Sequence, residues 1–375
     1  MNKKLMIISF STISRDPRVL RQIEVLSESY DLEVVGFGPD PDDDRISFLD
    51  VGLLESASPL WKIGGAVRLL ARQFDAFYWK TPWVASARNL ISGRRPDAVI
   101  ANDISALPIA FDLGVPVLYD AHEYSPREYE ESLKWRVFFR RYSHYMCSMY
   151  LPKVAAMTTV CEGIRDEYHR SYGVQAEVVH NAPFWKDPRF RATDPEHIRL
   201  IHHGAADKSR QIESMIDMVS LLDDRFSLSL MLVGGGSYLE SLKSRARGKE
   251  RIEFVEPVKT GDICRVIGEY DIGVYLLRPT NFNNAHALPN KFFEFIQAGL
   301  ALAIGPSMEM KALVEKYDCG VFSDSFEFSS LARCLNELNA DDIDELKKAS
   351  IVAAKSLGFE SDANVLRDAV SRIVN

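Results

Sequence analysis

Each half of this 375-residue chain alternates short apolar runs with amphipathic stretches. This order is the pattern of parallel sheets whose strands are joined by crossover helices. In the first half we expect strands at residues 4–10, 31–37, 97–102, 116–121, 155–160 and 176–181. In the second half we expect them at 198–204, 228–234, 251–256, 271–277, 300–305 and 319–322. The sequence therefore predicts an α/β fold of two Rossmann-like, doubly wound domains.

Helices are expected between these strands, at about 17–29, 105–113, 132–150 and 161–171. Asp16 is suited to cap the first of them, and Pro17 suits its first turn. The segment 181–197 is rich in proline and polar residues, so we place a joint there and predict domains at 1–183 and 184–357. Because such sheets bind ligands at the C-terminal ends of their strands, the two domains are expected to face a central cleft.

The bulk composition favours a soluble globular protein, with 46% hydrophobic and 26% charged residues. No apolar run has the length of a membrane span, and the opening "MNKKLMIISFSTIS" is interpreted as a first strand rather than a signal peptide. The five cysteines are scattered and form no CxxC pair, which indicates neither a disulfide framework nor a zinc site. We expect a cytoplasmic location.

Charge is distributed unevenly along the chain. The net charge of −8 argues against nucleic acid as a partner, yet residues 61–96 sum to +6 and residues 134–160 to +5. The first segment also holds Trp61, Phe74, Phe77, Tyr78, Trp79 and Trp83. Aromatic residues with Lys and Arg suit a membrane interface, so peripheral contact with an anionic membrane is expected. The alternative is ordinary helix cores with basic outer faces.

Three loops in the second half are compatible with phosphate. "PNKFFE" begins a helix at Pro289 and Asn290, with Lys291 and Glu294 on its first turns. Helix starts favour anions, so Lys291 is sensible if a phosphate lies beside it, with Glu294 accepting from the hydroxyls of a ribose. Alone, the pair also fits an i,i+3 ion pair on a solvated face.

The other two loops follow strands. Gly204 allows close backbone approach, and Lys208 or Arg210 is able to reach a diphosphate. Gly234 and Gly235 open a glycine turn into a helix, which lets backbone approach a nucleotide. Each loop alone also fits a plain turn or a solvated helix start, but their agreement favours a nucleotide site.

In the first half, "NDIS" and "YDAHEYS" end consecutive strands, so Asp103, His122 and Glu123 are expected to point into the cleft. Taken alone, His122 also fits a histidine bonded to backbone. Asp103 and Glu123 either orient an acceptor hydroxyl or cap the following helices.

Together these motifs resemble the retaining GT-B glycosyltransferases of family 4, which build bacterial polysaccharides and glycolipids. The resemblance rests on "RDPRVLRQIEVLSESYDLEVVGFG", "PDAVIANDISALP", "PVLYDAHEYSP", "TTVCEGIRDEY", "VVHNAP", "LMLVGGG", "DIGVYLL" and "LPNKFFEFIQAGLALA", in the expected order. It implies transfer of a sugar from a nucleotide-sugar, UDP-sugar favoured over GDP-sugar, to a glycan or lipid-linked acceptor. It also implies that residues 358–375 form a helix that crosses back to the N-terminal domain.

The resemblance assigns roles to individual positions. The catalytic residues it implies are His122, Asp103, Glu123, Lys291 and Arg210. Donor-binding positions are Gly204, Lys208, Arg210, Gly234, Gly235, His286, Pro289, Asn290, Lys291 and Glu294. Acceptor-side positions are Arg15, Asp16, Arg18, Asn102, Asp103 and Asn181.

Two departures from the family pattern touch the donor site. Gly204 is followed by Ala205 instead of arginine, and Arg210 stands at the place of the usual lysine. Lys291 is expected to restore the missing cation. His286 stands where the first glutamate of the family's Glu, seven residues, Glu pattern belongs, which leaves the contacts to the transferred sugar open.

No metal or other cofactor is expected, because a helix N-terminus with Arg210 and Lys291 is able to neutralise a departing diphosphate. The acidic string "GPDPDDDR", residues 38–45, is interpreted as a solvated turn, with a metal-dependent site as the alternative. Retention of anomeric configuration is implied by the resemblance. Two other functions stay open: a nucleotide-sugar epimerase of the same fold, and a catalytically silent subunit that binds a partner.

Overall fold

The computed structural model of this chain describes residues 3–52 and 58–374. Contacts divide the chain into two compact units. The first comprises residues up to Val179, the short segment Asn281–Asn283 and the chain from Asp362 onward, and the second comprises His180–Thr280 and Asn284–Ser361. The boundaries lie at 179/180 and 361/362, a few residues from the 183/184 and 357/358 expected from the sequence. The assignment of 281–283 to the first unit was not predicted.

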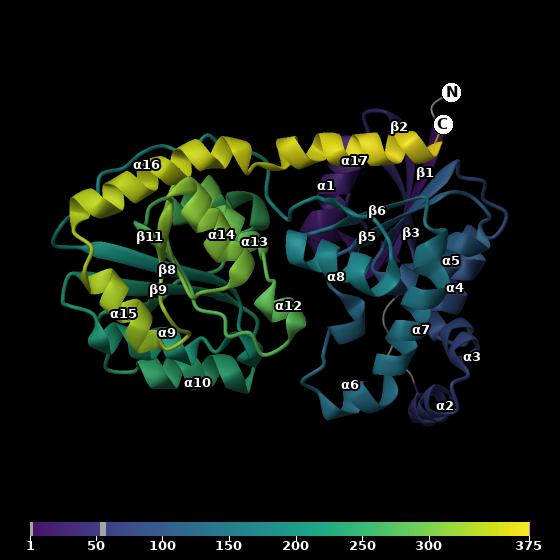
Figure 1. Cartoon of the computed structure of the whole chain (residues 1–375), viewed down its shortest axis with the longest axis horizontal. Coiled ribbons are helices and arrows are strands. Elements are labelled where there is room, and N and C mark those ends of the chain that lie inside the picture. The colour runs from purple at the N-terminus through teal and green to yellow at the C-terminus, as the bar shows by residue number, and fades with distance from the viewer. Residues whose placement is uncertain (1–2, 53–57, 375) are drawn as a thin grey trace. The chain divides into compact units, whose positions relative to one another are not determined.

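In the described residues of the first unit, seven parallel strands form one sheet, in the order β3-β2-β1-β4-β5-β6-β7. Figure 1 labels β1, β2, β3, β5 and β6 of this sheet. Their bounds are β1 Lys3–Thr12, β2 Tyr30–Phe37, β3 Ile46–Asp50, β4 Ala98–Asn102, β5 Val117–Ala121, β6 Ala156–Thr159 and β7 Glu177–Val178. The strand β3 was not predicted. It is an edge strand with half-buried side chains, so it lacks the continuous apolar run of the others.

The helices of the first unit are α1 Pro17–Leu26, α2 Pro59–Leu70, α3 Phe74–Trp79, α4 Pro82–Ile91, α5 Leu107–Asp112, α6 Leu133–Phe138, α7 Arg140–Tyr150, α8 Glu162–Tyr172 and most of α17 Phe359–Val374. The carboxylate of Asp16 caps α1 as predicted, accepting from the backbone N–H groups of Arg18 and Val19. The single helix expected over 132–150 is wrong: α6 and α7 are separate helices that meet at Phe139, whose ring packs edge-on against Phe77.

In the second unit, the described strands form a parallel sheet in the order β10-β9-β8-β11-β12-β13. Their bounds are β8 Ile198–Ala205, β9 Phe226–Val233, β10 Ile252–Phe254, β11 Ile272–Tyr275, β12 Ala301–Ile304 and β13 Gly320–Phe322. The helices are α9 Glu213–Met218, α10 Ser237–Ala246, α11 Ile263–Ile267, α13 Asn290–Gln297, α14 Met308–Tyr317, α15 Phe328–Asn336 and α16 Ala340–Ser356, with α12 Phe282–Ala285 spanning the boundary. Both sheets are doubly wound, as predicted, and their order reverses at β1/β4 and at β8/β11.

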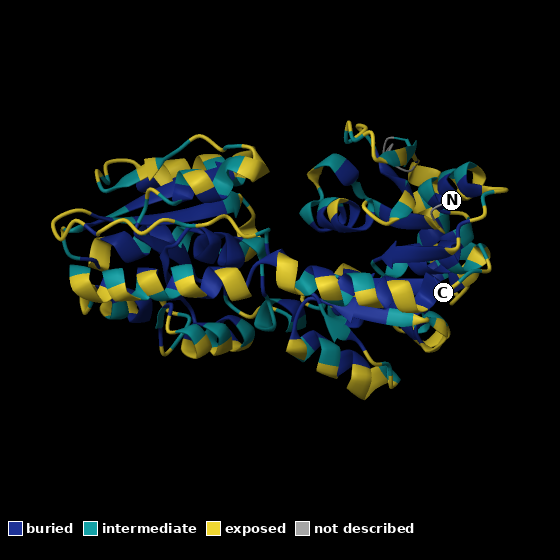
Figure 2. Cartoon of the chain, turned by 90° about the horizontal axis from the view of Figure 1, so that it is seen from above, coloured by how far each residue is buried: buried dark blue, intermediate teal, exposed yellow. Residues whose placement is uncertain are grey.

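Burial follows this architecture: the inner strands of each sheet are mostly dark blue in Figure 2, and helices carry exposed residues on their outer faces. One close contact positions the helix α13. A Cβ atom on Gly273 of β11 would lie 2.3 Å from Cγ of Phe295, so glycine is required for this ring to rest on the strand. Phe292, Phe293 and Phe295 are fully buried. The first turn of α13 is thereby held near the C-terminal end of β11.

None of the helices formed by residues 3–52 and 58–374 combines the length and the apolar character needed to cross a bilayer.

Candidate functional site

A cluster of cations lies where β8 and β11 end, at the point where strand order reverses. The ammonium of Lys291, on the first turn of α13, is 2.8 Å from the position that a Cβ atom on Gly204 would occupy. The same Nζ lies 4.7 Å from the ring centre of Tyr275 and 3.5 Å from Nε2 of His202. Arg210 donates from Nη1 to the Tyr275 hydroxyl at 2.7 Å. The structure thus brings Gly204, Arg210 and Lys291 together.

Among the described residues, Lys291 is a buried amine without a carboxylate in contact with it. In the part of the chain that the structure describes, no carboxylate lies within 4.0 Å of the Lys291 ammonium. Burial and the nearby Arg210 guanidinium lower the pKa of Lys291 well below its usual range, and the more distant Glu294 only partly opposes them. Because burying an uncompensated ammonium is costly, the arrangement favours an anion that fills the site.

His202 and Tyr275 were not predicted as site residues. The Nδ1 of His202 donates to the carbonyl oxygen of Val274 at 2.9 Å, which leaves Nε2 as an acceptor facing Lys291. Burial and the Lys291 charge lower the pKa of His202, so the ring is neutral. The sequence did not indicate His202, because a histidine inside the apolar strand "IRLIHHG" carries no signal that distinguishes a site residue from a core residue.

Glu294 lies one turn further along α13, and it is only 7% exposed. Its Oε2 is 3.5 Å from Nε2 of His203, whose ring meets Phe295 edge-on. Burial and Lys291 lower the pKa of His203 to about 3, so this second histidine is also neutral. The Nε2 of His203 is buried and has no hydrogen-bond partner among the described residues, and a neutral ring does not cancel the charge of the carboxylate. Glu294 therefore keeps the acceptor capacity that binding of hydroxyl groups requires.

The start of α13 also has free hydrogen-bonding capacity. Pro289 is the N-cap and gives no side-chain cap, and Oδ1 of the first helical residue, Asn290, is buried with no partner among the described residues. Helix starts of this kind bind anions through their N–H groups.

The remaining donor-side candidates differ in their surroundings. Lys208 is exposed in a short 3-10 turn, and the loop of Gly234 and Gly235 has open space where side chains would be. His286 is held by the carboxylate of Glu309, with Nδ1 and Oε1 2.8 Å apart. Glu309, on the first turn of α14, was not predicted. It supplies an acid beside the position where the family pattern has its first glutamate.

Gly204 allows a direct test of the cation cluster. We expect Gly204→Ala to lower donor kcat/KM about 10-fold, because the new methyl group displaces the Lys291 ammonium. Gly248→Ala is the matched control, since Gly248 also has a positive φ, of 78°, but open space around it. Both variants bear backbone strain. Equal kinetics in the two variants would contradict the role of the Gly204–Lys291 contact.

In the first unit, His122 lies between two carboxylates at the ends of β4 and β5. Its Nδ1 is 3.4 Å from Oδ2 of Asp103, and its Nε2 is 3.5 Å from Oδ2 of Asp120. Burial by itself lowers the pKa of His122, but the two carboxylates raise it above its ordinary value. The ring is also 3.2 Å from Oδ1 of Asn102. His122 is therefore a charged or readily charged group at the C-terminal edge of this sheet.

Asp103 sits in a strained backbone conformation, with φ of 62°. Such a conformation costs on the order of 1–3 kcal/mol in a non-glycine residue, and it occurs often at functional sites. Burial and the Asp103 charge raise the pKa of a further acid, Glu128, to about 7. Glu128 was not predicted, and it adds a carboxyl group that titrates near neutral pH.

The carboxylate of Glu123 accepts from the side chain of Asn283 at 3.2 Å.

Two acceptor-side candidates lie in surroundings that the sequence did not indicate. Arg18 is almost fully buried, and its guanidinium donates to Asp120 and to the carbonyl oxygen of Val179, so it positions Asp120. This pair holds the pKa of Asp120 well below its usual range, although burial opposes it. Asn181 belongs to the second unit, because the boundary falls before it.

The other acceptor-side residues have mixed roles. Asp16 is the cap of α1, and Asn102 is buried in a network with Gln22 and His122. Arg15 is exposed. In the acidic string 38–45, Asp43 pairs with Arg45, which also reaches Glu24. Over the described residues, no group of three His, Cys, Asp or Glu side chains has the arrangement of a metal site.

Comparison with known proteins fits this architecture. Residues 21–182 match the model of Glycosyltransferase Family 4. Sucrose-phosphate synthase from Thermosynechococcus elongatus shares the fold, with a TM-score of 0.73, 12% sequence identity and 99% of each chain covered. Anabaena HepE in complex with UDP-glucose superposes with a TM-score of 0.72 at 14% identity, covering 98% of this chain and 99% of that one.

A third similar structure is that of S. aureus TarM in complex with fondaparinux, α-GlcNAc-glycerol and UDP. It covers 100% of both chains, with a TM-score of 0.71 and 10% identity. A comparison of the sequence with curated proteins found no match.

Two doubly wound parallel sheets, each with polar residues at the point where its strand order reverses, give this chain the GT-B fold of these solved structures. Within that fold, residues 21–182 are similar to glycosyltransferase family 4.

Proposed function

We propose that the enzyme transfers a sugar from a UDP-sugar to a glycan or lipid-linked acceptor, with retention of anomeric configuration and without a metal, in the synthesis of cell-surface polysaccharide. The observation that carries the donor assignment is the buried, unneutralised Lys291 beside Arg210 and Gly204, one helical turn before the buried carboxylate of Glu294. This spacing suits a diphosphate joined to a ribose. HepE and TarM were both solved with UDP, which supports uridine as the base.

In the proposed reaction, the main requirement is to stabilise the negative charge that develops on the leaving group. As the bond between the anomeric carbon and the diphosphate breaks, negative charge grows on the departing UDP, and Lys291, Arg210 and the start of α13 stabilise it. The acceptor oxygen bonds to the anomeric carbon on the same face, and the hydroxyl proton passes to the departing diphosphate oxygen. His122, with Asp103 and Glu123, is assigned to the sugar and the acceptor hydroxyl. His286, oriented by Glu309, is assigned to the transferred sugar.

A donor panel tests this function. Incubation with UDP-, GDP- and other nucleotide-sugars should release UDP from a UDP-sugar when an acceptor is present, and proton NMR of the first product should show the donor's anomeric configuration. Isomerised sugar without UDP release would indicate an epimerase. If neither UDP release nor isomerised sugar is detected, the result would indicate a silent subunit that binds a partner.

Metal independence is a separate expectation. The cationic side chains replace the charge of an ion, so an excess of EDTA should leave the rate within about twofold of its starting value. A rate abolished by EDTA and restored by Mg²⁺ or Mn²⁺ would contradict this and direct attention to Asp40–Asp44.

We also place the enzyme in the cytoplasm, with the first unit attached to the inner face of the membrane. The +11 carried by residues 61–96 and 134–160 supports this attachment, because each cation near an anionic surface contributes roughly 1 kcal/mol. The enzyme should sediment with anionic vesicles at low salt and be released at high salt.

Arg140→Glu/Arg141→Glu should reduce the sedimented fraction by more than half. The control Lys348→Glu/Lys355→Glu makes the same charge change on α16 and should have little effect. Recovery of the unmodified enzyme in the supernatant at low salt would favour a soluble acceptor.

A further inference from the structure

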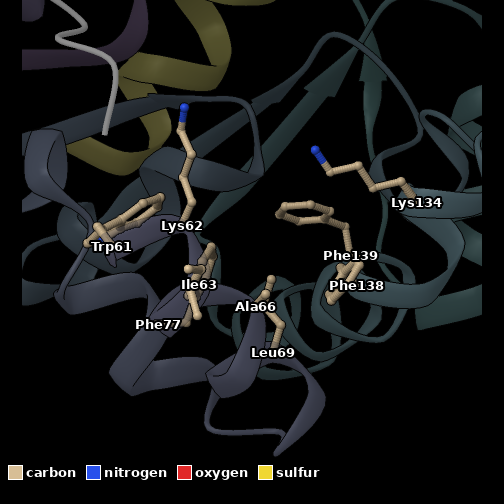
Figure 3. Close-up of a pocket in the computed structure, with 10 residues that line it drawn as sticks. Trp61, Lys62, Ile63, Ala66, Leu69, Phe77, Lys134, Phe138 and Phe139 are labelled. Carbon is tan, nitrogen blue, oxygen red and sulfur yellow. The ribbon is translucent and has the colours of Figure 1, made fainter. Parts of the chain in front are cut away.

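An apolar groove lies between α2 and α6 in the first unit, away from the polar residues at the strand ends. Its volume is about 350 Å³, within the range of small-molecule sites. Figure 3 shows the apolar residues that line it, with Ala66 and Leu69 on one side and Phe139 on the other. The complete lining is Trp61, Lys62, Ile63, Gly65, Ala66, Leu69, Phe77, Lys134, Phe138 and Phe139.

The groove is preformed by fixed side chains. The indole N–H of Trp61 donates to the carbonyl oxygen of Lys80 at 2.9 Å, and its ring packs on Phe77 and Trp83. A Cβ atom on Gly65 would lie 3.2 Å from the Phe77 ring, so the absence of a side chain there keeps the floor open. The cavity is thus a feature of packed helices.

Large apolar side chains on the two helices that form the groove are exposed, and one of them, Ile63, lines it. On α2 they recur at helical spacing, and on α6 they are one turn apart, with exposed fractions from 50% for Val137 to 82% for Leu60. The set is Leu60, Ile63, Val67, Leu70, Leu133 and Val137. Contiguous exposed apolar residues on a soluble domain mark an interaction surface.

Two cations stand at the rim. Lys62 and Lys134 point away from the apolar side chains, with their amines on the same open side (Figure 3). Within the described residues, neither amine has a carboxylate within 4.0 Å. An apolar interior with two free cations at its mouth complements an apolar chain with an anionic head.

We propose that this groove binds one hydrocarbon chain of an anionic membrane lipid, with Lys62 and Lys134 contacting the phosphate of its head group. The inference deepens the proposed membrane attachment and rests on it: electrostatic attraction brings the surface to the bilayer, and the groove then holds a single chain. Attachment would therefore depend on chain chemistry as well as on charge.

Monomeric probes test the groove without a bilayer and without the transferase reaction. Hexyl, octyl and decyl phosphate, each below its micelle-forming concentration, should bind with one-to-one stoichiometry in isothermal titration calorimetry. Affinity should rise by about fourfold per methylene group, because each buried CH₂ contributes a fixed increment. Ala66→Trp, which fills the groove, should weaken octyl phosphate at least 10-fold. Ala85→Trp, the same change at an exposed position of α4, should not.

The role of the two lysines is tested with two ligands that have the same hydrocarbon chain, octyl phosphate and 1-octanol. Lys62→Glu/Lys134→Glu should weaken octyl phosphate at least 10-fold and leave 1-octanol unchanged. Absence of saturable binding, or affinity insensitive to chain length or to Ala66→Trp, would overturn the proposal. So would a dimer in sedimentation velocity that Ala66→Trp dissociates, since a second copy would then be the occupant.

The outcome is separable from the proposed function. UDP release without octyl phosphate binding would remove the groove assignment alone. Octyl phosphate binding without any nucleotide-sugar turnover would remove the transferase proposal alone.

Discussion

Glu294→Ala should reduce kcat/KM for the UDP-sugar by at least about 100-fold. A charged acceptor contributes about 1.5–3 kcal/mol per hydrogen bond, and the carboxylate is assigned two ribose hydroxyls. The group is buried beside a neutral His203, so solvent offers the hydroxyls no substitute. Glu294→Gln preserves the volume and one acceptor oxygen, and its loss should be smaller, about 10-fold.

The ribose assignment has a sharper readout than activity. The unmodified enzyme should bind UDP much more tightly than 2′,3′-dideoxy-UDP, and Glu294→Ala should bind the two with similar affinity. Glu240→Gln on α10, an exposed carboxylate paired with Lys243, is the control and should keep the discrimination. If Glu294→Ala still distinguishes the two nucleotides, the carboxylate does not contact the ribose.

Lys291→Met should lower kcat about 100-fold with a smaller change in donor affinity. The ammonium is assigned to charge that develops on the departing diphosphate, so its removal affects the transition state more than the bound donor. A loss of this size corresponds to about 2.7 kcal/mol of transition-state stabilisation. Lys243→Met, which removes an exposed cation from α10, should leave kcat unchanged. A change confined to donor affinity would show that Lys291 only binds.

The same substitution should stabilise the free enzyme. Because folding lowers the pKa of Lys291, the unfolded chain binds this proton more readily than the folded chain. The resulting cost is fully present below the folded-state pKa and disappears as the pH rises towards the unfolded value of about 10.4. Lys291→Met should therefore raise the melting temperature near neutral pH, with a gain that shrinks in alkaline buffer. A lower melting temperature of Lys291→Met at neutral pH would contradict the claim that the buried Lys291 destabilises the free enzyme.

The donor loops show how far local sequence reaches. "PNKFFE" predicted the helix start at Asn290 and the pairing of a cation with a carboxylate on its first turns, because capping and helical spacing are local properties. It gave no indication of which strand the helix packs on. That depends on Gly273, which lies 18 residues before Lys291 in the chain and admits the Phe295 ring. This contact between distant segments holds α13 where Lys291 lies near Gly204, Tyr275 and His202.

Acceptor-side residues show the converse. Arg18 has the same charge as Arg210, and sequence alone gives both the character of ligand-binding arginines. The structure separates them: Arg18 is sequestered by Asp120, which is 102 residues away, whereas Arg210 donates to a tyrosine hydroxyl beside an unneutralised lysine. The roles of Glu128, Glu309 and His203 were likewise invisible, since each depends on neighbours from other elements.

By itself, the sequence determined the two doubly wound sheets, most of their strands and the position of the phosphate-compatible loops. These features follow from apolar periodicity, glycine placement and helix-start signals, which are local patterns of a few residues. The tertiary structure decided which charges are neutralised, which histidines stay neutral and where exposed apolar residues gather. Desolvation and ion pairing depend on the distances between distant segments, and no local pattern encodes them.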